Sequence, residues 1–246
     1  MIKQKFCIDN REISSNFPPY VIAEVSANHN GSIQRAKDTI LAAKNAGVDA
    51  VKIQTYTPDT MTIDVENTDF YIKEGLWKNR SLYDLYREAY TPYEWHEELF
   101  KFSNDIGVTL FSSPFDESAV DLLVSLNVPA FKVASFEVVD LPLIKYIASK
   151  KKPILMSTGM ASLEEIGNAV ESAKSAGNQD LALFHCISSY PALISESNLN
   201  LITILRKEFS IQVGLSDHTI GNLASVVATS LGASMIEKHF TLNRSE

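Results

Sequence analysis

The chain has 246 residues, of which 22 are basic and 30 acidic, so its formal net charge at neutral pH is −8. This balance argues against a general nucleic-acid binder, because phosphate contacts need a clustered basic face. No apolar run approaches the roughly 20 residues of a membrane span, and two distant cysteines, Cys7 and Cys186, argue against a disulfide framework and favour a reducing cytoplasm.

Short apolar runs that alternate with amphipathic segments are the main pattern of the chain. The runs predict eight strands, which begin at Tyr20, Asp49, Gly107, Val128, Lys152, Leu181, Ile211 and Ala233. The segments between them predict helices; residues 32–47 end at a glycine, and residues 162–177 begin with a capping box of Ser162 and Glu165. Eight strand–helix repeats favour an α/β fold, the closed (β/α)₈ TIM barrel. The alternative is an open doubly wound sheet, although no GxGxxG follows the first strand.

Two segments depart from this regular alternation. Residues 1–19 are predicted to be an N-terminal extension that caps a barrel formed by residues 20–246. The long segment 56–106 is predicted to be an inserted loop at the catalytic rim, with Tyr56, Tyr71, Trp77 and Tyr83, followed by a helix that begins near residue 81. Since the sequence stops a few residues after the eighth strand, without an eighth helix, we expect it to be a piece of a longer protein.

Polar residues alternate with apolar ones along several predicted strands. Alternate strand residues face the barrel interior, and those expected to face inward include Glu24, Lys52, Gln54, Lys132, Gln212, Ser216, His218, Glu237 and His239. Burying an unpaired charge is costly, so several such residues at the carboxyl ends of the strands predict a site there. For single residues the alternatives are an ion pair of Glu24 with Lys52 or Lys132, and a hydrogen-bonded core histidine at His218.

The residue types indicate an anionic ligand and a divalent cation. Two lysines lie among serines at the ends of predicted strands, namely Ser113, Ser135, Ser157, Ser188 and Ser216. Fixed positive charge with hydroxyls suits a phosphate or carboxylate, although each serine could instead cap a helix. His218 and His239 could hold one divalent metal, with water or substrate oxygens completing its shell.

Motifs over nearly the whole chain resemble the sialic acid synthase family. These are YVIAEVSANHNGS, VKIQTYTPDTMT, FSSPFDESAVDLL, AFKVASFEVVDLPLIK, ILMSTGMASLEEI, HCISSYPA, GLSDHTIG and IEKHFT. The resemblance implies a condensation of phosphoenolpyruvate with an amino sugar. The insert GLWKNRSLYDLYREAYTPYEWH is most similar to the branch of the family that makes pseudaminic acid, which implies a 2,4-diacetamido-2,4,6-trideoxyhexose as the sugar. Family members continue with a last barrel helix and an antifreeze-like domain, and a homodimer is implied for the full-length protein.

The resemblance also implies roles for individual residues of this chain. Glu24 is implied to be the acid/base group, and His218 and His239 to bind Mn²⁺, Mg²⁺ or Co²⁺. Residues implied to hold the substrates are Lys52, Gln54, Ser113, Lys132, Ser135, Ser157, Ser188, Tyr190 and Ser216. The alternatives are an N-acetylneuraminate or legionaminate synthase, a Schiff-base aldolase that uses Lys52 or Lys132, and a non-catalytic sugar-phosphate-binding barrel. Neither nucleic acid nor membrane is an expected partner.

Overall fold

Parallel strands close on themselves in the computed structural model, which describes residues 5–75 and 77–245. The strands are β3 (Tyr20–Glu24), β4 (Ala50–Thr55), β5 (Thr109–Pro114), β6 (Phe131–Val133), β7 (Ile154–Ser157), β8 (Leu181–Cys186), β9 (Gln212–Asp217) and β10 (Met235–His239). They pair in the order β10-β3-β4-β5-β6-β7-β8-β9, and β10 returns to β3 with His239 opposite Glu24. The predicted (β/α)₈ TIM barrel is therefore confirmed, and the open sheet is excluded.

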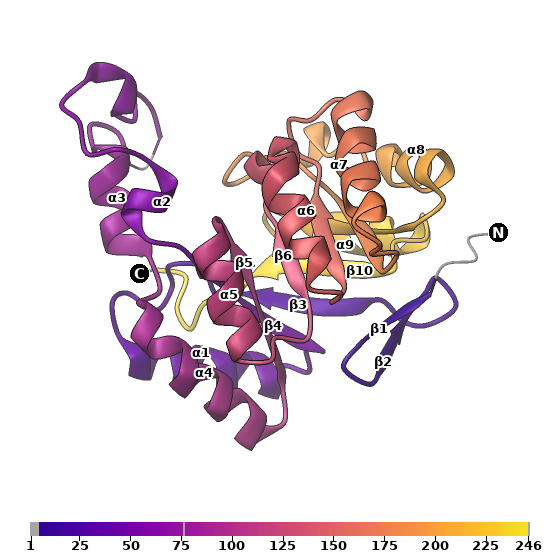
Figure 1. The fold of residues 1–246 in the computed structure, drawn as a ribbon, viewed down its shortest axis with the longest axis horizontal. Coiled ribbons are helices and arrows are strands. Elements are labelled where there is room, and N and C mark those ends of the chain that lie inside the picture. Colours follow the sequence, from indigo (N-terminus) through magenta and orange to yellow (C-terminus); the bar gives the residue numbers. More distant parts are fainter. Residues whose placement is uncertain (1–4, 76, 246) are drawn as a thin grey trace.

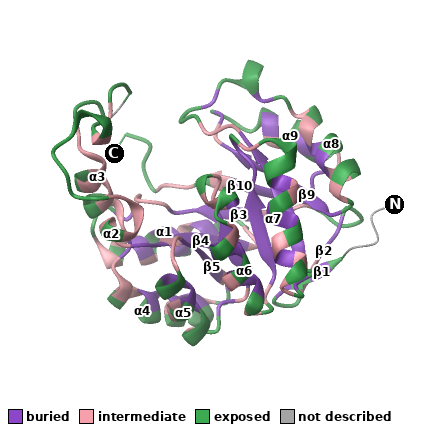
Figure 2. Ribbon diagram, turned by 45° about the horizontal axis from the view of Figure 1, so that its top comes forward, coloured by how far each residue is buried: buried purple, intermediate pink, exposed green. Residues whose placement is uncertain are grey.

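Helices cover the outside of the barrel, and their outer faces are exposed while the strands are buried (Figure 2). The barrel helices are α1 (Ile33–Asn45), α4 (Tyr93–Ile106), α5 (Glu117–Ser125), α6 (Leu141–Ser149), α7 (Leu163–Ser175), α8 (Asn200–Phe209) and α9 (Leu223–Ser230). The segment between β4 and α4 adds α2 (Pro58–Met61) and α3 (Leu82–Ala89), and short 3₁₀ turns lie at η1 (Thr68–Phe70), η2 (Phe136–Val139) and η3 (Ile194–Glu196). The predicted capping box of Ser162 and Glu165 starts α7. None of the helices in the described part of the chain is long and apolar enough to cross a membrane.

The second half of the segment between β4 and β5 contains two helices, α3 and α4, where a single one was expected. Tyr90 has an extended backbone, and Pro92 is the N-cap residue of α4, which begins at Tyr93 after α3 has ended at Ala89. Proline lacks an amide proton and disfavours the helical conformation in the residue before it, so it interrupts the helix. The first half of the segment is mostly loop, as predicted, and it rises with α2 and α3 at the end of the barrel where β3 ends (Figure 1).

An antiparallel hairpin lies at the opposite end of the barrel (Figure 1). Its strands are β1 (Phe6–Ile8) and β2 (Arg11–Ile13). Phe6, Ile8 and Ile13 are buried in the hydrophobic core. The guanidinium of Arg11 lies 3.4 Å from Asp49. The hairpin is thus packed onto the amino ends of the strands, away from the rim where the polar residues gather.

A close approach inside the barrel explains one glycine of β9. A Cβ on Gly214 would lie 2.7 Å from the carbonyl oxygen of Met235 and 2.9 Å from the ring of Phe184. Both distances are shorter than real Cβ contacts allow, so the absence of a side chain here makes room for the Phe184 ring. That ring forms part of the floor beneath the polar residues, because the Lys132 ammonium lies 5.4 Å above its centroid.

Candidate active site

A cavity of about 250 Å³ opens at the carboxyl ends of the strands. Its lining contains the following residues singled out in the sequence: Glu24, Lys52, Gln54, Ser113, Lys132, Ser135, Ser157, Tyr190, Ser216, His218 and His239. Ser188 is not part of the lining. It is half-buried at the rim, where a Cβ built on Gly159 would meet its hydroxyl at 2.5 Å. The alternation along the strands therefore brings together residues from β3, β4, β5, β6, β7, β9 and β10.

A larger hollow, of about 770 Å³, lies at the other end of the barrel beside the β1–β2 hairpin. Its charged residues, Asp9, Arg11 and Asp49, are all partly or fully exposed to solvent. The smaller cavity instead gathers Glu24, Lys52 and other ionisable groups that are almost entirely buried. Since such groups are retained in an interior only when partners or function require them, we assign the candidate site to the smaller cavity.

Glu24 and Lys52 form a buried ion pair on neighbouring strands. The Lys52 ammonium lies 2.7 Å from Glu24 Oε2, and the Gln54 amide donates to Glu24 Oε1 at 2.9 Å. Burial raises the pKa of Glu24, and this outweighs the opposing effect of Lys52. Burial also disfavours the charge of Lys52, but the carboxylates of Glu237 and Glu24 outweigh it and raise the pKa of Lys52. Glu24 thus forms the ion pair with Lys52 that the sequence offered as an alternative, and this pair is part of the cavity wall.

Lys132 has a different electrostatic environment from Lys52. Its ammonium donates to Ser157 Oγ and to the carbonyl oxygen of Val133 at 3.2 Å, and it lies 4.0 Å from Glu237 Oε1. Burial lowers the pKa of Lys132 despite the attraction of Glu237. An anion that enters the cavity would favour the charged form of this lysine, which makes Lys132 suited to bind one.

The serine hydroxyls of the cavity contact other side chains of the cavity rather than helix ends, and three of the four contact charged groups. Ser113 Oγ accepts from Lys52 at 3.1 Å, and Ser216 Oγ donates to Glu237 at 3.0 Å. Ser135 precedes η2 without a side-chain capping bond, and its hydroxyl lies 3.1 Å from Cys186 Sγ. With Ser157 bound to Lys132, the capping alternative fails for all four of these serines.

Two imidazoles meet at the mouth of the cavity. The ring centroids of His218 and His239 are 5.5 Å apart. His218 Nδ1 lies 2.7 Å from the carbonyl oxygen of Ile187. Because a carbonyl can only accept, Nδ1 carries the proton and Nε2 keeps its lone pair. Burial lowers the pKa of His218. The pKa of His239 is also lowered, mainly because the surrounding pocket walls remove water from the ring and secondly because Lys52 is positively charged. The side chain of His239 nevertheless keeps an exposed edge at the mouth.

This donor set fits a divalent cation in part. Neutral imidazole nitrogens are good ligands for such ions, and the bond from His218 to Ile187 is the kind of outer contact that orients a ligating histidine. Within the described residues, no group of three or more His, Cys, Asp or Glu side chains is arranged to hold a metal. A cation held by His218 and His239 would therefore take its remaining ligands from water or substrate.

Aromatic residues from two different segments line the mouth. Tyr190, in the loop after β8, places its ring 4.2 Å from that of His218. Trp77 comes from the insert and lines the same cavity. The other aromatic residues predicted for this rim do not line the cavity. Tyr83 bonds to Asp59 and Tyr71 forms a β-bridge with Ser81, both within the insert. Tyr56 is buried against Tyr86 of the insert and Phe115, which follows β5.

Other ionisable residues in or near the site received no role from the sequence; Glu237 and Cys186 line the cavity, and Glu137 lies outside its lining. Glu237 was expected to face inward, and it is the centre of the network that joins Lys52, Lys132 and Ser216. Cys186 lies opposite Ser216 in the ladder, so the same alternation could have found it. Glu137 follows β6 in η2, where burial raises the pKa of its carboxyl to about 7. Its position in a loop carries no periodic signal.

Comparisons with known proteins give a consistent result. Residues 39–246 match the model of the NeuB family. The chain is 47% identical to the pseudaminic acid synthase of Helicobacter pylori, over 93% of this chain and 67% of that protein, and 48% identical to that of Campylobacter jejuni, over 92% and 66%. It is 37% identical to the N,N'-diacetyllegionaminic acid synthase of Legionella pneumophila, over 94% and 66%.

Solved structures agree with this. The N-acetylneuraminic acid synthetase of Leptospira borgpetersenii superposes with a TM-score of 0.88 at 29% identity, covering 98% of this chain and 80% of that one. The spore coat polysaccharide biosynthesis protein SpsE of Bacillus subtilis superposes with a TM-score of 0.83 at 34% identity, covering 98% and 64%. The chain spans about two thirds of the length of the curated relatives described above.

Proposed function

The chain belongs to the NeuB family, and on this premise we propose that it condenses phosphoenolpyruvate with a 2,4-diacetamido-2,4,6-trideoxyhexose to give pseudaminic acid and phosphate. The observation that carries the proposal is the cavity in which two buried lysines, Lys52 and Lys132, lie beside the neutral histidines His218 and His239. The higher identity to pseudaminic acid synthases than to a legionaminic acid synthase supports this choice of sugar.

Phosphoenolpyruvate carries a phosphate and a carboxylate, and the lysines provide two places for anions. Lys132 with Ser157 forms one, and Lys52 with Ser113 forms the other. Ammonium and hydroxyl groups fixed in a cavity bind such oxygens without much reorganisation. Much of the rate gain would then come from positioning the enol ester beside the sugar.

We propose that His218 and His239 hold a divalent cation, Mn²⁺, Mg²⁺ or Co²⁺. When bound, such a cation would polarise the carbonyl oxygen of the open-chain sugar as a Lewis acid. The proposal is supported by the lowered pKa of both imidazoles, which keeps them neutral near pH 7. It is also supported by the unprotonated Nε2 of His218, which lies 3.3 Å from a Ser216 hydroxyl that donates to Glu237. Its direct test is a Mn²⁺ titration, in which His218→Ala should weaken the site.

The chemistry forms one carbon–carbon bond and releases phosphate. C3 of phosphoenolpyruvate attacks the carbonyl carbon of the sugar, the carbonyl oxygen gains a proton, water adds at C2, and phosphate leaves with cleavage of its C–O bond. Glu24 would take the proton from the attacking water or pass one to the sugar oxygen. The raised pKa of Glu24 and its place between Lys52 and Gln54 support such proton transfer.

The walls of the mouth support a sugar without a 6-hydroxyl. Trp77 and Tyr190 offer aromatic surface at the opening, where a methyl group and acetamido groups can pack. We expect kcat/KM to be higher for the trideoxy sugar than for N-acetylmannosamine. Apolar walls discriminate weakly against an added hydroxyl, so the preference should be about 10²-fold rather than 10⁵-fold. A preference for N-acetylmannosamine would instead assign the protein to the N-acetylneuraminate branch.

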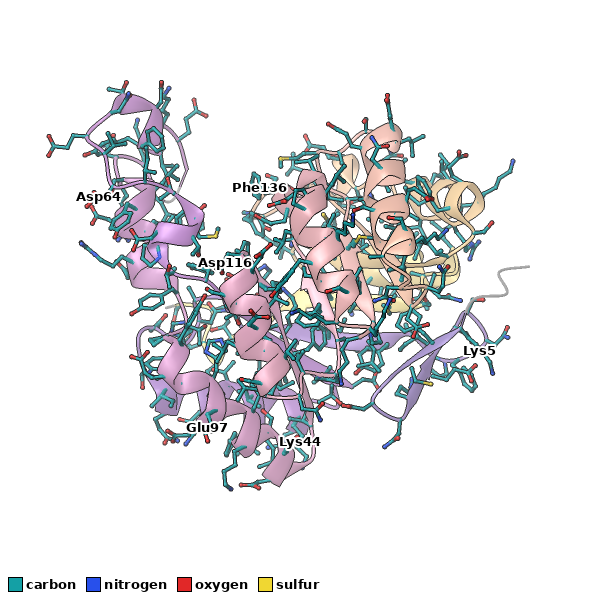
Figure 3. The ribbon with its side chains drawn as sticks, viewed as in Figure 1. Lys5, Lys44, Asp64, Glu97, Asp116 and Phe136 are labelled. Carbon is teal, nitrogen blue, oxygen red and sulfur yellow. The ribbon has the colours of Figure 1, made fainter. Side chains whose placement is uncertain are left out.

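We also propose a homodimer that buries an apolar patch around the mouth. This rim patch consists of exposed residues that follow β6, β7, β8 and β9, namely Phe136, Val139, Met160, Leu163, Leu193, Ile194, Ile220 and Leu223. Phe136 lies on the side of the barrel that faces the insert, and the insert carries Asp64 (Figure 3). Large apolar side chains left exposed in neighbouring loops commonly mark an interface.

Sedimentation velocity tests the dimer. Met160→Glu with Leu193→Glu should convert it to a monomer, whereas Ile204→Glu, on the exposed face of α8 and outside the rim patch, should leave it intact. A monomeric wild-type protein, or a rim-patch variant that is still dimeric, would overturn this assignment.

The two unpaired cysteines, Cys7 and Cys186, support a reducing compartment such as the cytoplasm.

A further inference from the structure

One loop connects the strand that carries Glu24 to the strand that carries His239. It is the loop between β3 and α1, residues 25–32, which leaves the sheet immediately after Glu24. The side-chain amide of Asn28 in this loop donates to the carbonyl oxygen of Phe240 at 2.9 Å. Phe240 is the residue that follows His239, so this bond links the loop after Glu24 to the segment that carries the second histidine.

Both polar groups of the Phe240 backbone are bound to the β3 side. Its N–H donates to the carbonyl oxygen of Glu24 at 2.8 Å, and its C=O accepts from Asn28. Phe240 lies just beyond the last residue of β10, where the ladder ends. A strand end without further pairing frays readily. The Asn28 bond therefore continues the pairing of β10 by one residue past His239.

Asn28 is itself held in place. Its backbone N–H donates to Val25 at 3.0 Å, and its carbonyl oxygen accepts from Arg35 Nε of α1 at 3.0 Å. The loop also keeps two non-glycine residues in the left-handed region, Ser26 at φ 49° and Asn30 at φ 47°. Such backbone persists only where its surroundings hold it, so Asn28 is a fixed donor.

The two histidines are oriented by different means. The ring of His218 is fixed by its own bond to Ile187. The described residues provide no such bond to the ring of His239, which lies edge-on to Tyr190 at 5.6 Å. The orientation of His239 therefore depends on its backbone, and its backbone depends on the residue that follows it.

We propose that Asn28 is a positioning residue for His239: through the carbonyl of Phe240 it sets the place of the second imidazole relative to His218 and Glu24. The metal part of this statement rests on the proposed function, since it assumes that His239 is a ligand. Outer contacts that position metal ligands typically change affinity by about 10- to 100-fold.

The test compares Asn28→Ala with Asn30→Ala in metal-free protein titrated with Mn²⁺ by calorimetry. Asn28→Ala removes the donor to Phe240. Asn30→Ala places alanine in the left-handed region of the same loop, and so weakens the loop without touching Phe240. We expect the Mn²⁺ Kd of Asn28→Ala to rise about 10-fold or more. The Mn²⁺ Kd of Asn30→Ala should stay near the wild-type value, even if its melting temperature falls by as much as that of Asn28→Ala.

A second readout does not depend on the metal. Hydrogen exchange of the Phe240 amide should be faster in Asn28→Ala and unchanged in Asn30→Ala. Wild-type protein that binds no Mn²⁺ would refute the proposed metal site, and the exchange of Phe240 would then decide the role of Asn28 alone. Unchanged Phe240 exchange in Asn28→Ala, or an equal loss of Mn²⁺ affinity in both variants, would overturn the positioning role.

Discussion

Glu24 pairs with Lys52 in the interior of the barrel and also lines the cavity. A buried ion pair is weak evidence for stabilisation, because desolvation offsets most of the attraction between the two charges. The pair is more informative about protons. A carboxyl group whose pKa is raised by burial beside a lysine can hold or release a proton without leaving its place.

We predict that Glu24→Gln lowers kcat for phosphate release by about 10²- to 10⁴-fold, the usual effect of removing a general base. The glutamine keeps the shape of the side chain and one acceptor for Gln54. The matched control is Glu12→Gln, which breaks the exposed pair of Glu12 with Lys5. Near-normal turnover combined with a lower melting temperature would show that Glu24 is structural.

Glu137 should make stability depend on pH. Burial raises its pKa from the ordinary 4.5 to about 7 in the folded protein. The folded state therefore binds the proton more tightly than the unfolded state, and its contribution to stability is lost as the pH rises from about 4.5 to about 7, by at most about 3 kcal/mol. Urea unfolding at several pH values should show this fall in the free energy of unfolding.

The variant Glu137→Gln should flatten that part of the pH dependence. Glu171→Gln, which changes an exposed carboxylate on α7, should leave it as in the wild type. A slope that is the same in the wild type and in Glu137→Gln would contradict the assignment.

At the scale of elements, the loop between β7 and α7 shows how the rim is packed. A Cβ on Gly159 would lie 2.5 Å from Ser188 Oγ, 2.8 Å from Cys186 Sγ and 2.9 Å from Ser135 Oγ. Three loops thus meet at one point without room for a methyl group. Any added atom must displace Ser135 and Cys186, which line the cavity.

We predict that Gly159→Ala weakens phosphoenolpyruvate binding by about 10-fold or more, since overpacking of this kind costs roughly 1–3 kcal/mol. Gly167→Ala, within α7 of the same unit, is the control. There the nearest atom, in the ring of Phe209, is 3.7 Å away, and alanine should raise the melting temperature through its higher helix propensity. Isothermal titration of both variants checks this, and wild-type affinity in Gly159→Ala would refute it.

The insert between β4 and β5 marks the limit of what periodicity can predict. The helix break at Thr91 could have been predicted from Pro92 alone. The reach of Trp77 into the cavity could not, because it depends on the path of a loop with no repeating pattern. Likewise the loop after β8 leaves Ser188 outside the lining of the cavity, since strand alternation no longer applies beyond Cys186.

At the scale of the whole molecule, the eight strands and most of the inward residues were predictable because both depend on short-range patterns. A period of two places Glu237 and His239 on one face whatever the rest of the chain does. Which lysine pairs with Glu24 was not predictable, because it depends on the register between strands. The structure sets Glu24 opposite Lys52, and this register makes the ion pair.

The most direct test of the central claim is phosphate release from phosphoenolpyruvate labelled with ¹⁸O in the bridging C–O bond. The account predicts release only when both the trideoxy sugar and a divalent metal are present, with the label in the phosphate and one pseudaminic acid formed per phosphate. Release without sugar, label retained in the sugar acid, or a borohydride-trapped lysine adduct would contradict it. Binding of phosphoenolpyruvate with no turnover of any amino sugar would also contradict it, and would instead identify a barrel that binds without catalysis.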